Sequence, residues 1–254
     1  SMYSQLVLLL TVCLTGYIHY SEAACGCPRQ YSYGIDSRET DKDGLVEGDI
    51  KPTPHYWAVM SGFRAATSRY SRWPGGKVYY DMSRIGYQYR SKITSALNAL
   101  SQMTGGCVSF QEVSNYRGAH VSVFHGQGCY SMIGRLGGAQ QLSLHYNCFT
   151  DHTIQHEFLH ALGFFHEQSR PDRDNHLNVH WDNIDSQMCG NFNKCRGCTT
   201  YTPFDIQSVM QYPGSGFSCN RRPTLTTKSG GSIGWNTRVT ALDVSKIKSY
   251  YECR

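Results

Sequence analysis

The spacing of hydrophobic residues changes several times along the chain, and each spacing predicts a different element. Between residues 84 and 104 apolar side chains recur every three or four positions, which predicts an amphipathic helix. The same spacing predicts helices over Thr153–Leu162 and Asp243–Tyr251. Apolar and polar residues alternate in four short segments that we expect to be strands: Lys77–Asp81, Cys107–Phe110, His120–His125 and Gln141–His145. Between the second and third predicted helices neither spacing persists, and loops are expected there.

The first residues of the chain predict a secretion signal that is not part of the fold. Leu6–Ile18 is an apolar run of 13 residues, and the small residues Ser21 and Ala23 fit a signal-peptidase site. We therefore assign residues 1–23 to a signal peptide and expect a secreted, extracellular protein; a buried helix of the fold is the alternative. No later apolar run reaches the roughly 18 residues that a membrane span needs, so no membrane anchor is expected.

Residues 24–64 form a second distinct segment, which is rich in charged residues, glycine and proline. Because this segment lacks amphipathic periodicity, we expect it to be extended and to lie over another part of the molecule. Residues 65–254 contain all the predicted helices and strands, and we expect them to form one domain.

Composition excludes some classes of function. The chain has a formal net charge of +5 over 254 residues, and its Lys and Arg residues are scattered rather than gathered in basic runs. Nucleic-acid and anionic-membrane partners are therefore not expected. A hydrophobic content of 40% with 17% charged residues is typical of a globular chain rather than a disordered one.

Eleven cysteines are many for a chain of this length, and in an exported protein they favour disulfides. Cys13 falls in the predicted signal, and Cys25 and Cys27 lie just after it. The main body carries an even set of eight, which predicts four disulfides among Cys107, Cys129, Cys148, Cys189, Cys195, Cys198, Cys219 and Cys253. Two alternatives stay open: a zinc knuckle built from the four residues between 189 and 219, or a redox-active Cys195-x-x-Cys198 pair.

The predicted helix over Thr153–Leu162 carries a pattern typical of a metal site. His156 and His160 stand four positions apart, so both imidazoles lie on one face of the helix. Gly163 ends the helix, because glycine enters the left-handed conformation at little cost, and the chain can then bring His166 back as a third ligand. Three histidines with an open fourth position are typical of a catalytic zinc site.

Glu157 lies beside the predicted ion but outside its ligand set. One bound Zn²⁺ lowers the pKa of its water to about 7 and polarises a carbonyl group. Glu157 would act as general base, taking a proton from that water and passing it to the leaving amine. The sequence therefore predicts a zinc-dependent endopeptidase. Ordinary surface or core histidines are the alternative, which the number of coinciding positions disfavours.

Two segments resemble a known family. His156–Arg173, HEFLHALGFFHEQSRPDR, resembles the active-site signature of the astacin family of metzincin zinc endopeptidases, and Ser208–Tyr212, SVMQY, resembles that family's Met-turn. The resemblance covers most of residues 65–254 and implies an α+β catalytic domain. Its upper lobe would be a twisted mixed sheet with two helices, and its lower lobe would be loop-rich with a C-terminal helix and disulfides. A monomer that cleaves proteins or peptides in extended conformation is implied.

The same resemblance assigns further residues. Met210 would form an apolar floor below the zinc ligands, and Tyr212 would be a fifth ligand that moves during turnover to hydrogen-bond the oxyanion. An edge strand within residues 128–144 would bind substrate by strand addition. The resemblance also implies the disulfides Cys107–Cys253 and Cys129–Cys148. It leaves two additional bridges, with open pairing, among Cys189, Cys195, Cys198 and Cys219.

The Gly48-Asp49 dipeptide resembles part of a motif through which the family's propeptides block the active site. That motif has an aromatic residue where this chain has Val46, and its Asp binds the zinc in place of water. We therefore expect residues 24–64 to be a propeptide, with Asp49 as a zinc ligand in an inactive precursor. A plain Gly-Asp turn is the alternative.

Cleavage after Arg64 by an activating protease would convert this precursor to the enzyme. The resemblance implies that the new terminus at Ala65 folds inward and meets Glu167. Two rival functions are a catalytically idle metal-binding or adhesion module and a structural disulfide-rich domain. The presence of Glu157 and Tyr212 disfavours the first, and the histidine pattern disfavours the second.

Overall fold

The computed structural model describes residues 25–28, 40–62 and 72–253, so the predicted signal peptide and the Arg64–Ala65 bond lie outside the described residues. The α-helices are α2 (Pro54–Met60), α3 (Tyr87–Met103), α4 (Asp151–Leu162) and α5 (Ala241–Tyr251). The strands are β1 (Lys77–Arg84), β2 (Ser109–Glu112), β3 (His120–Phe124), β4 (Cys129–Ser131), β5 (Ala139–Leu144), β6 (Leu177–Val179) and β7 (Leu225–Thr227). The three predicted helices and the four predicted strands are confirmed within a few residues at each end.

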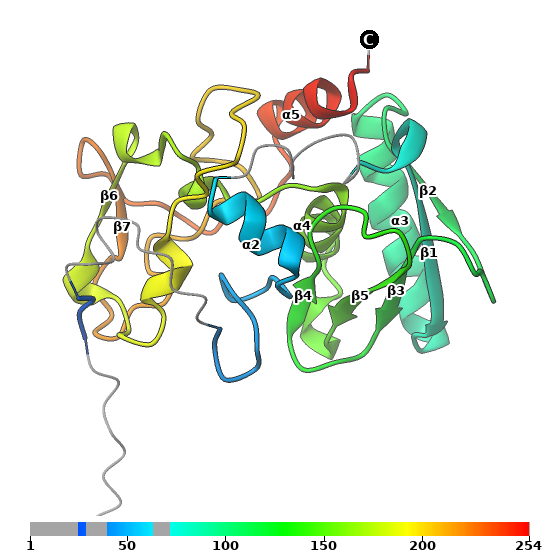
Figure 1. Cartoon of the computed structure of the whole chain (residues 1–254), viewed down its shortest axis with the longest axis horizontal. Helices are drawn as coiled ribbons and strands as arrows, with labels where there is room; N and C mark the ends of the chain where they lie inside the picture. The colour runs from blue at the N-terminus through cyan, green and yellow to red at the C-terminus, as the bar shows by residue number, and fades with distance from the viewer. Residues whose placement is uncertain (1–24, 29–39, 63–71, 254) are drawn as a thin grey trace, which may run out of the picture.

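The upper lobe is a five-stranded mixed sheet in the order β2-β1-β3-β5-β4, which lies on the right in Figure 1. Neighbouring strands run parallel, except that β4 pairs antiparallel with β5 and forms one edge. Alternate residues of β1, Val78 and Tyr80 among them, are buried in one core with Ile93 of α3 and Phe158 of α4. The alternation of the strand and the periodicity of the helices thus bury the same cluster.

Helix α4 begins and ends where its sequence provides caps. The Thr150 side chain accepts a hydrogen bond from the Thr153 N–H at 3.2 Å, which satisfies one of the free donors of the first turn. Gly163 has a φ of 114°, the left-handed conformation that ends the helix. Its Cβ-free backbone turns the chain sharply towards His166, as predicted.

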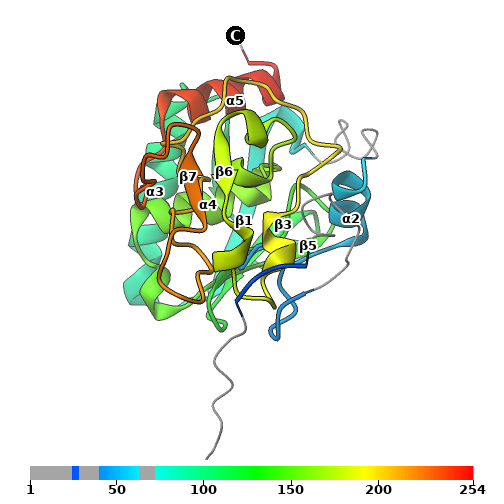
Figure 2. The ribbon, with the colours of Figure 1, turned by 90° about the vertical axis from the view of Figure 1, so that its left-hand side faces the viewer.

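The lower lobe, on the left in Figure 1, is built mainly from loops and short 3₁₀ helices. Strands β6 and β7 pair antiparallel, and both can be seen side by side in Figure 2. Each of these strands has three residues, which is too short for an alternating pattern to be recognised, so neither strand was predicted. Helix α5 completes the domain, and Thr240 with Asp243 forms a capping box at its first turn.

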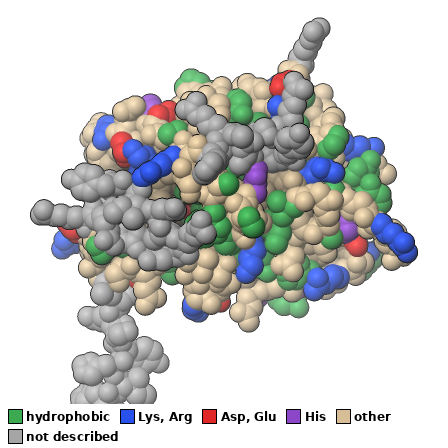
Figure 3. Space-filling view, viewed as in Figure 1, with side chains coloured by type: hydrophobic (Ala, Val, Ile, Leu, Met, Phe, Trp, Pro, Cys, Tyr) green, Lys and Arg blue, Asp and Glu red, His purple; other side chains and the backbone are tan. Residues whose placement is uncertain are grey.

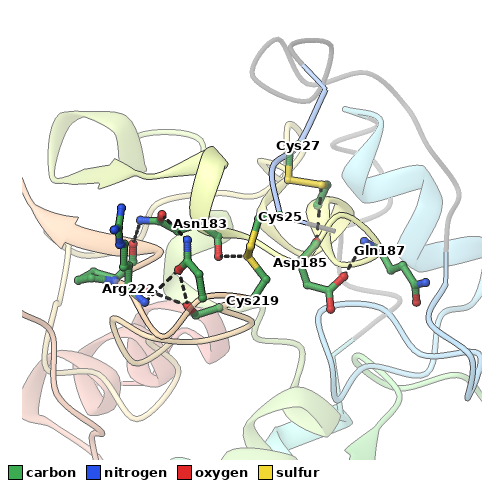
Figure 4. Close-up of a disulfide and its surroundings, with 11 residues drawn as sticks. Cys25, Cys27, Asn183, Asp185, Gln187, Cys219 and Arg222 are labelled. Carbon is green, nitrogen blue, oxygen red and sulfur yellow. Dashed lines mark hydrogen bonds between the residues drawn. A yellow bond between two sulfur atoms is a disulfide. The ribbon is translucent and has the colours of Figure 1, made fainter. Parts of the chain in front are cut away.

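Five disulfides join described cysteines, which fits an oxidising compartment. The implied Cys107–Cys253 and Cys129–Cys148 bridges are confirmed. The expectation of two bridges within the remaining set of four is wrong, because only Cys195–Cys198 forms inside it. Cys219 pairs with Cys25, and Cys189 pairs with Cys27 (Figure 4). All four sulfur atoms are therefore in disulfides, so a zinc knuckle is excluded.

The segment 40–62 lies between the two lobes in Figure 1. We expected it to be extended throughout, but residues Pro54–Met60 form helix α2. Thr53 caps helix α2, and Pro54 occupies its first position, where a missing N–H costs nothing. Tyr56 of this helix is buried, and it shares an apolar cluster with Ile50 and with Ile133 of the upper lobe. Seven residues are too few for a helical periodicity to stand out in the sequence.

Within the described ranges no helix is long and apolar enough to cross a membrane. Lys and Arg side chains are dispersed over the face that Figure 3 shows.

Candidate active site

Four side chains from two distant parts of the chain converge on one point. His156 and His160 project from one face of α4, and His166 follows the turn at Gly163. The fourth is Asp49, from the segment between the lobes. One ligand atom from each of these residues lies within 4.8 Å of the others. The structure therefore brings together all three predicted histidines and the predicted carboxylate.

Each imidazole is oriented by an acceptor at its Nδ1 atom. His156 Nδ1 lies 2.9 Å from the Val209 carbonyl, and His160 Nδ1 lies 2.7 Å from the Phe164 carbonyl. His166 Nδ1 lies 2.8 Å from Oε2 of Glu47. Carbonyl and carboxylate oxygens only accept, so each Nδ1 donates its proton to that partner and each Nε2 is left to face the centre.

The three Nε2 atoms face a common centre. The Nε2 atoms of His156 and His166 are 3.2 Å apart, and Asp49 Oδ2 lies 3.1 Å from the first and 3.2 Å from the second. His160 Nε2 and Asp49 Oδ1 are buried without a hydrogen-bond partner. A cation at the centre satisfies all of these atoms, and three imidazole nitrogens with one carboxylate oxygen are a zinc-type donor set. The residues present fit one Zn²⁺.

Glu157 lies beside this centre and faces a cleft. Its side chain is buried, its Oε2 has no hydrogen-bond partner, and burial together with the charge of Asp49 raises the pKa of the carboxyl well above its ordinary value. The cleft is a cavity of about 580 Å³ between the lobes. Residues after α4, including Tyr212 and Phe217, line it from the lower lobe, and the start of α4 lines it from the upper lobe.

Met210 lies in a turn that is fixed from two sides. Asp243 accepts hydrogen bonds from Ser208 Oγ at 2.6 Å and from the Val209 N–H at 3.2 Å. The Met210 carbonyl accepts the Glu167 N–H at 2.9 Å, next to the third histidine. Met210 is buried in the same cluster as α4, which supports the predicted apolar floor without testing its role.

Tyr212 is held away from the role predicted for it. Its hydroxyl donates to the main-chain carbonyl of Glu47, and its ring lies 4.8 Å from that of His166 between centroids. Burial and the negative charge of Glu47 raise the pKa of Tyr212 well above its ordinary value, so the hydroxyl stays protonated. Zinc ligation by Tyr212 stays a prediction.

Glu167 is fully paired within the described residues. Its carboxylate accepts Lys246 Nζ at 2.6 Å, Arg170 Nη1 at 2.7 Å and the Asp205 N–H at 2.9 Å. The predicted contact with Ala65 involves a residue outside the described ranges and stays a prediction.

Glu47 is a site residue that sequence reasoning missed. Its side chain is 1% exposed, and besides His166 it contacts the Tyr56 hydroxyl, which donates to Oε1 at 2.9 Å. The Glu47 N–H donates to Asn191 Oδ1 at 2.8 Å. The one signal for it was its place two residues before Asp49. Between the two, Gly48 has a φ of 82° and lies against the Phe217 ring.

The edge strand β4 is occupied by the same segment. Ser131 N–H donates to the Asp49 carbonyl at 2.9 Å, and Lys51 N–H donates to the Ser131 carbonyl at 2.8 Å. Ile50 forms a parallel bridge with Ser131. The edge available for strand addition is thus already paired, next to the zinc ligands.

Comparisons with known proteins agree with this geometry. A family model described as Astacin, a family of peptidases, matches residues 65–252. The chain is 31% identical to zinc metalloproteinase nas-6 of Caenorhabditis elegans, over 98% of this chain and 76% of that protein. It is 36% identical to nas-15 of the same organism over 75% of this chain, but it covers 34% of that protein's length. Among solved structures it is similar to high choriolytic enzyme 1, a hatching enzyme zinc-protease from Oryzias latipes, with 33% identity, a TM-score of 0.67, and coverage of 74% of this chain and 97% of that one.

Proposed function

The chain belongs to the astacin family of zinc metalloendopeptidases, and from that membership we propose that it is a secreted enzyme made as an inactive precursor. Residues 1–23 are its signal peptide, residues 24–64 its propeptide and residues 65–254 its catalytic domain. The single observation that carries the proposal is the centre of three histidines closed by Asp49, a carboxylate from the propeptide. Activation includes a cut at Arg64–Ala65 by an activating protease, and the active enzyme is a monomer.

The positions of the side chains support the following catalytic roles. His156, His160 and His166 would hold a zinc ion, which would supply a water of lowered pKa and polarise the scissile carbonyl. Glu157 accepts the proton from the attacking water and transfers it to the leaving amine, and its buried Oε2, which has no hydrogen-bond partner beside the cleft, supports this proposal. Tyr212 is freed from Glu47 when the propeptide leaves, and its hydroxyl then donates to the developing oxyanion.

The inhibitory segment, residues 45–50, blocks three parts of this machinery at once. Asp49 takes the ligand position that the water needs. The Glu47 carboxylate accepts from His166, and its carbonyl accepts from Tyr212. The backbone around Ile50 covers β4, the edge where an extended substrate would add as a strand. Inhibition therefore depends on several contacts rather than on Asp49 alone.

Hydrolysis of denatured casein by the processed protein tests the function. Activity should be lost with 1,10-phenanthroline, which removes zinc, and with Glu157→Ala, by a factor of about 10² or more. Glu112→Ala, which removes an exposed glutamate from β2, is the matched control and should keep full activity. Full activity of Glu157→Ala would refute the proposed role of this residue.

A further inference from the structure

Two disulfides join the proposed propeptide to the catalytic domain. Cys25 pairs with Cys219, and Cys27 pairs with Cys189, as Figure 4 shows. Both partners lie in the lower lobe, beyond the zinc-binding signature. A cut between Arg64 and Ala65 breaks neither of these bonds.

The residues around these cysteines also belong to the lower lobe by their backbone contacts. Gly26 N–H donates to the Ile184 carbonyl at 2.9 Å, and Cys27 N–H donates to the Trp181 carbonyl at 3.2 Å. Cys25 forms an antiparallel bridge with Asp185. Cys27 packs against the apolar cluster of the lower lobe, in which its partner sulfur is buried. Residues 25–27 therefore brace the domain, while residues 45–50 inhibit it.

We propose that cleavage after Arg64 alone leaves the enzyme latent, and that activation needs a second peptide-bond cleavage between Cys27 and Asp49. The mature protein is then a two-chain enzyme that keeps residues 25–27 attached through both disulfides. The inference rests on the proposed function, because it concerns the inhibitory segment of that site. Each cleavage is a hydrolysis in which one water adds across the peptide bond, giving a carboxylate and an ammonium group. The disulfides stay oxidised, so no reductant is required.

The tether keeps the inhibitory segment at high local concentration. Nineteen residues lie between Cys27 and Glu47, and a tether of this length gives an effective concentration on the order of 1 mM. If the tethered segment binds with a dissociation constant of about 1 µM, the ratio of bound to unbound segment is then about 10³. The same segment without the tether would dissociate at nanomolar enzyme. Covalent attachment thus decides whether a single cut produces activity.

Among the described residues, the turn Asp41–Gly44 is an accessible place for the second cut. Lys42 and Asp43 are exposed in the turn Asp41–Gly44, whereas Leu45, Val46 and Glu47 are buried. A cut between Lys42 and Asp43 separates the inhibitory segment from both disulfides. It leaves the brace at residues 25–27 in place.

The test uses the full chain with a site-specific protease sequence at 64–65 and, in a second version, another in the 41–44 turn. Peptidase activity is measured from about 10 µM to about 1 nM enzyme. The single-cut form should stay below about 1% of the double-cut activity at every dilution. A single-cut form with serine at Cys25, Cys27, Cys189 and Cys219 should become active on dilution. If this variant fails to fold, the single-cut and double-cut forms of the native chain still decide the question.

Mass measurement without reductant provides an independent readout. In the double-cut form, the fragment that contains Cys25 and Cys27 should remain with the catalytic domain until dithiothreitol is added. Equal activity of the single-cut and double-cut forms, or loss of that fragment without reductant, would overturn the inference. If both forms are inactive while the fragment is retained, the proposed function fails and the tether stands.

Discussion

Gly48 is the position where one methyl group should open the inhibited state. Its φ of 82° is left-handed, and a Cβ there would lie 2.6 Å from Cζ of Phe217 and 3.3 Å from Cε1. The conformation costs a non-glycine residue about 1 kcal/mol, and overpacking against a ring adds about 1–3 kcal/mol. Because every 1.4 kcal/mol is a factor of ten, the summed cost of about 2–4 kcal/mol means that Gly48→Ala should increase the open fraction of the precursor by about 30-fold to 700-fold.

The assay is the activity of the uncut precursor on a fluorogenic peptide, divided by that of the fully processed protein. Gly44→Ala is the matched control, because Gly44 has a φ of 71° but its Cβ would meet the mobile end of Lys51 at 3.2 Å. The control should leak less than Gly48→Ala. Adding Phe217→Leu to Gly48→Ala removes the clash and should restore part of the latency. An uncut Gly48→Ala precursor as silent as the wild type would refute this reasoning.

Three further predictions concern the elements that position the site. Asp243→Asn weakens the hydrogen bonds to Ser208 and Val209 and the N-terminal cap of α5. This substitution should lower the free energy of unfolding by about 2 kcal/mol, which urea denaturation would show as a lower midpoint. Thr150→Ala removes the N-terminal cap of α4 and should lower the free energy of unfolding by about 1 kcal/mol in the same assay. For either variant, an unchanged urea midpoint would contradict the expected loss of stability. Removing zinc from the precursor with a chelator should lower its melting temperature, because a ligand present at about 1,000 times its dissociation constant stabilises the folded state by about 4 kcal/mol. If added zinc does not restore the melting temperature, the result would argue against a zinc centre.

The parts of the site that are local in sequence could be predicted. His156 and His160 are one helical turn apart, and Gly163 fixes the exit towards His166, so the ligand set follows from helix geometry. Glu47 could not be found in this way, because its contact with His166 spans 119 residues. A buried carboxylate and an exposed one look alike in a charged segment until tertiary packing is known.

The cysteine pairing shows a second limit of sequence reasoning. The eight cysteines after residue 100 are an even set that can pair among themselves, so Cys25 and Cys27 were not needed to complete the predicted disulfides. The pairing depends on which Cα atoms the fold brings within disulfide reach, and both pairs span more than 160 residues. Only the bridges implied by the family resemblance, Cys107–Cys253 and Cys129–Cys148, could be named in advance.

The apolar cluster between segment 40–62 and the upper lobe bears on how the protein behaves in concentrated solution. Ile133 is buried at 2% exposure under Ile50 and Tyr56, and Phe165 stacks on the Tyr56 ring with 5.7 Å between centroids. Under the proposed activation, release of residues 43–64 would leave Ile133 and Phe165 facing water, and contiguous apolar surface of this kind promotes self-association. The precursor is therefore the form to concentrate and store, and the processed enzyme should lose colloidal stability first.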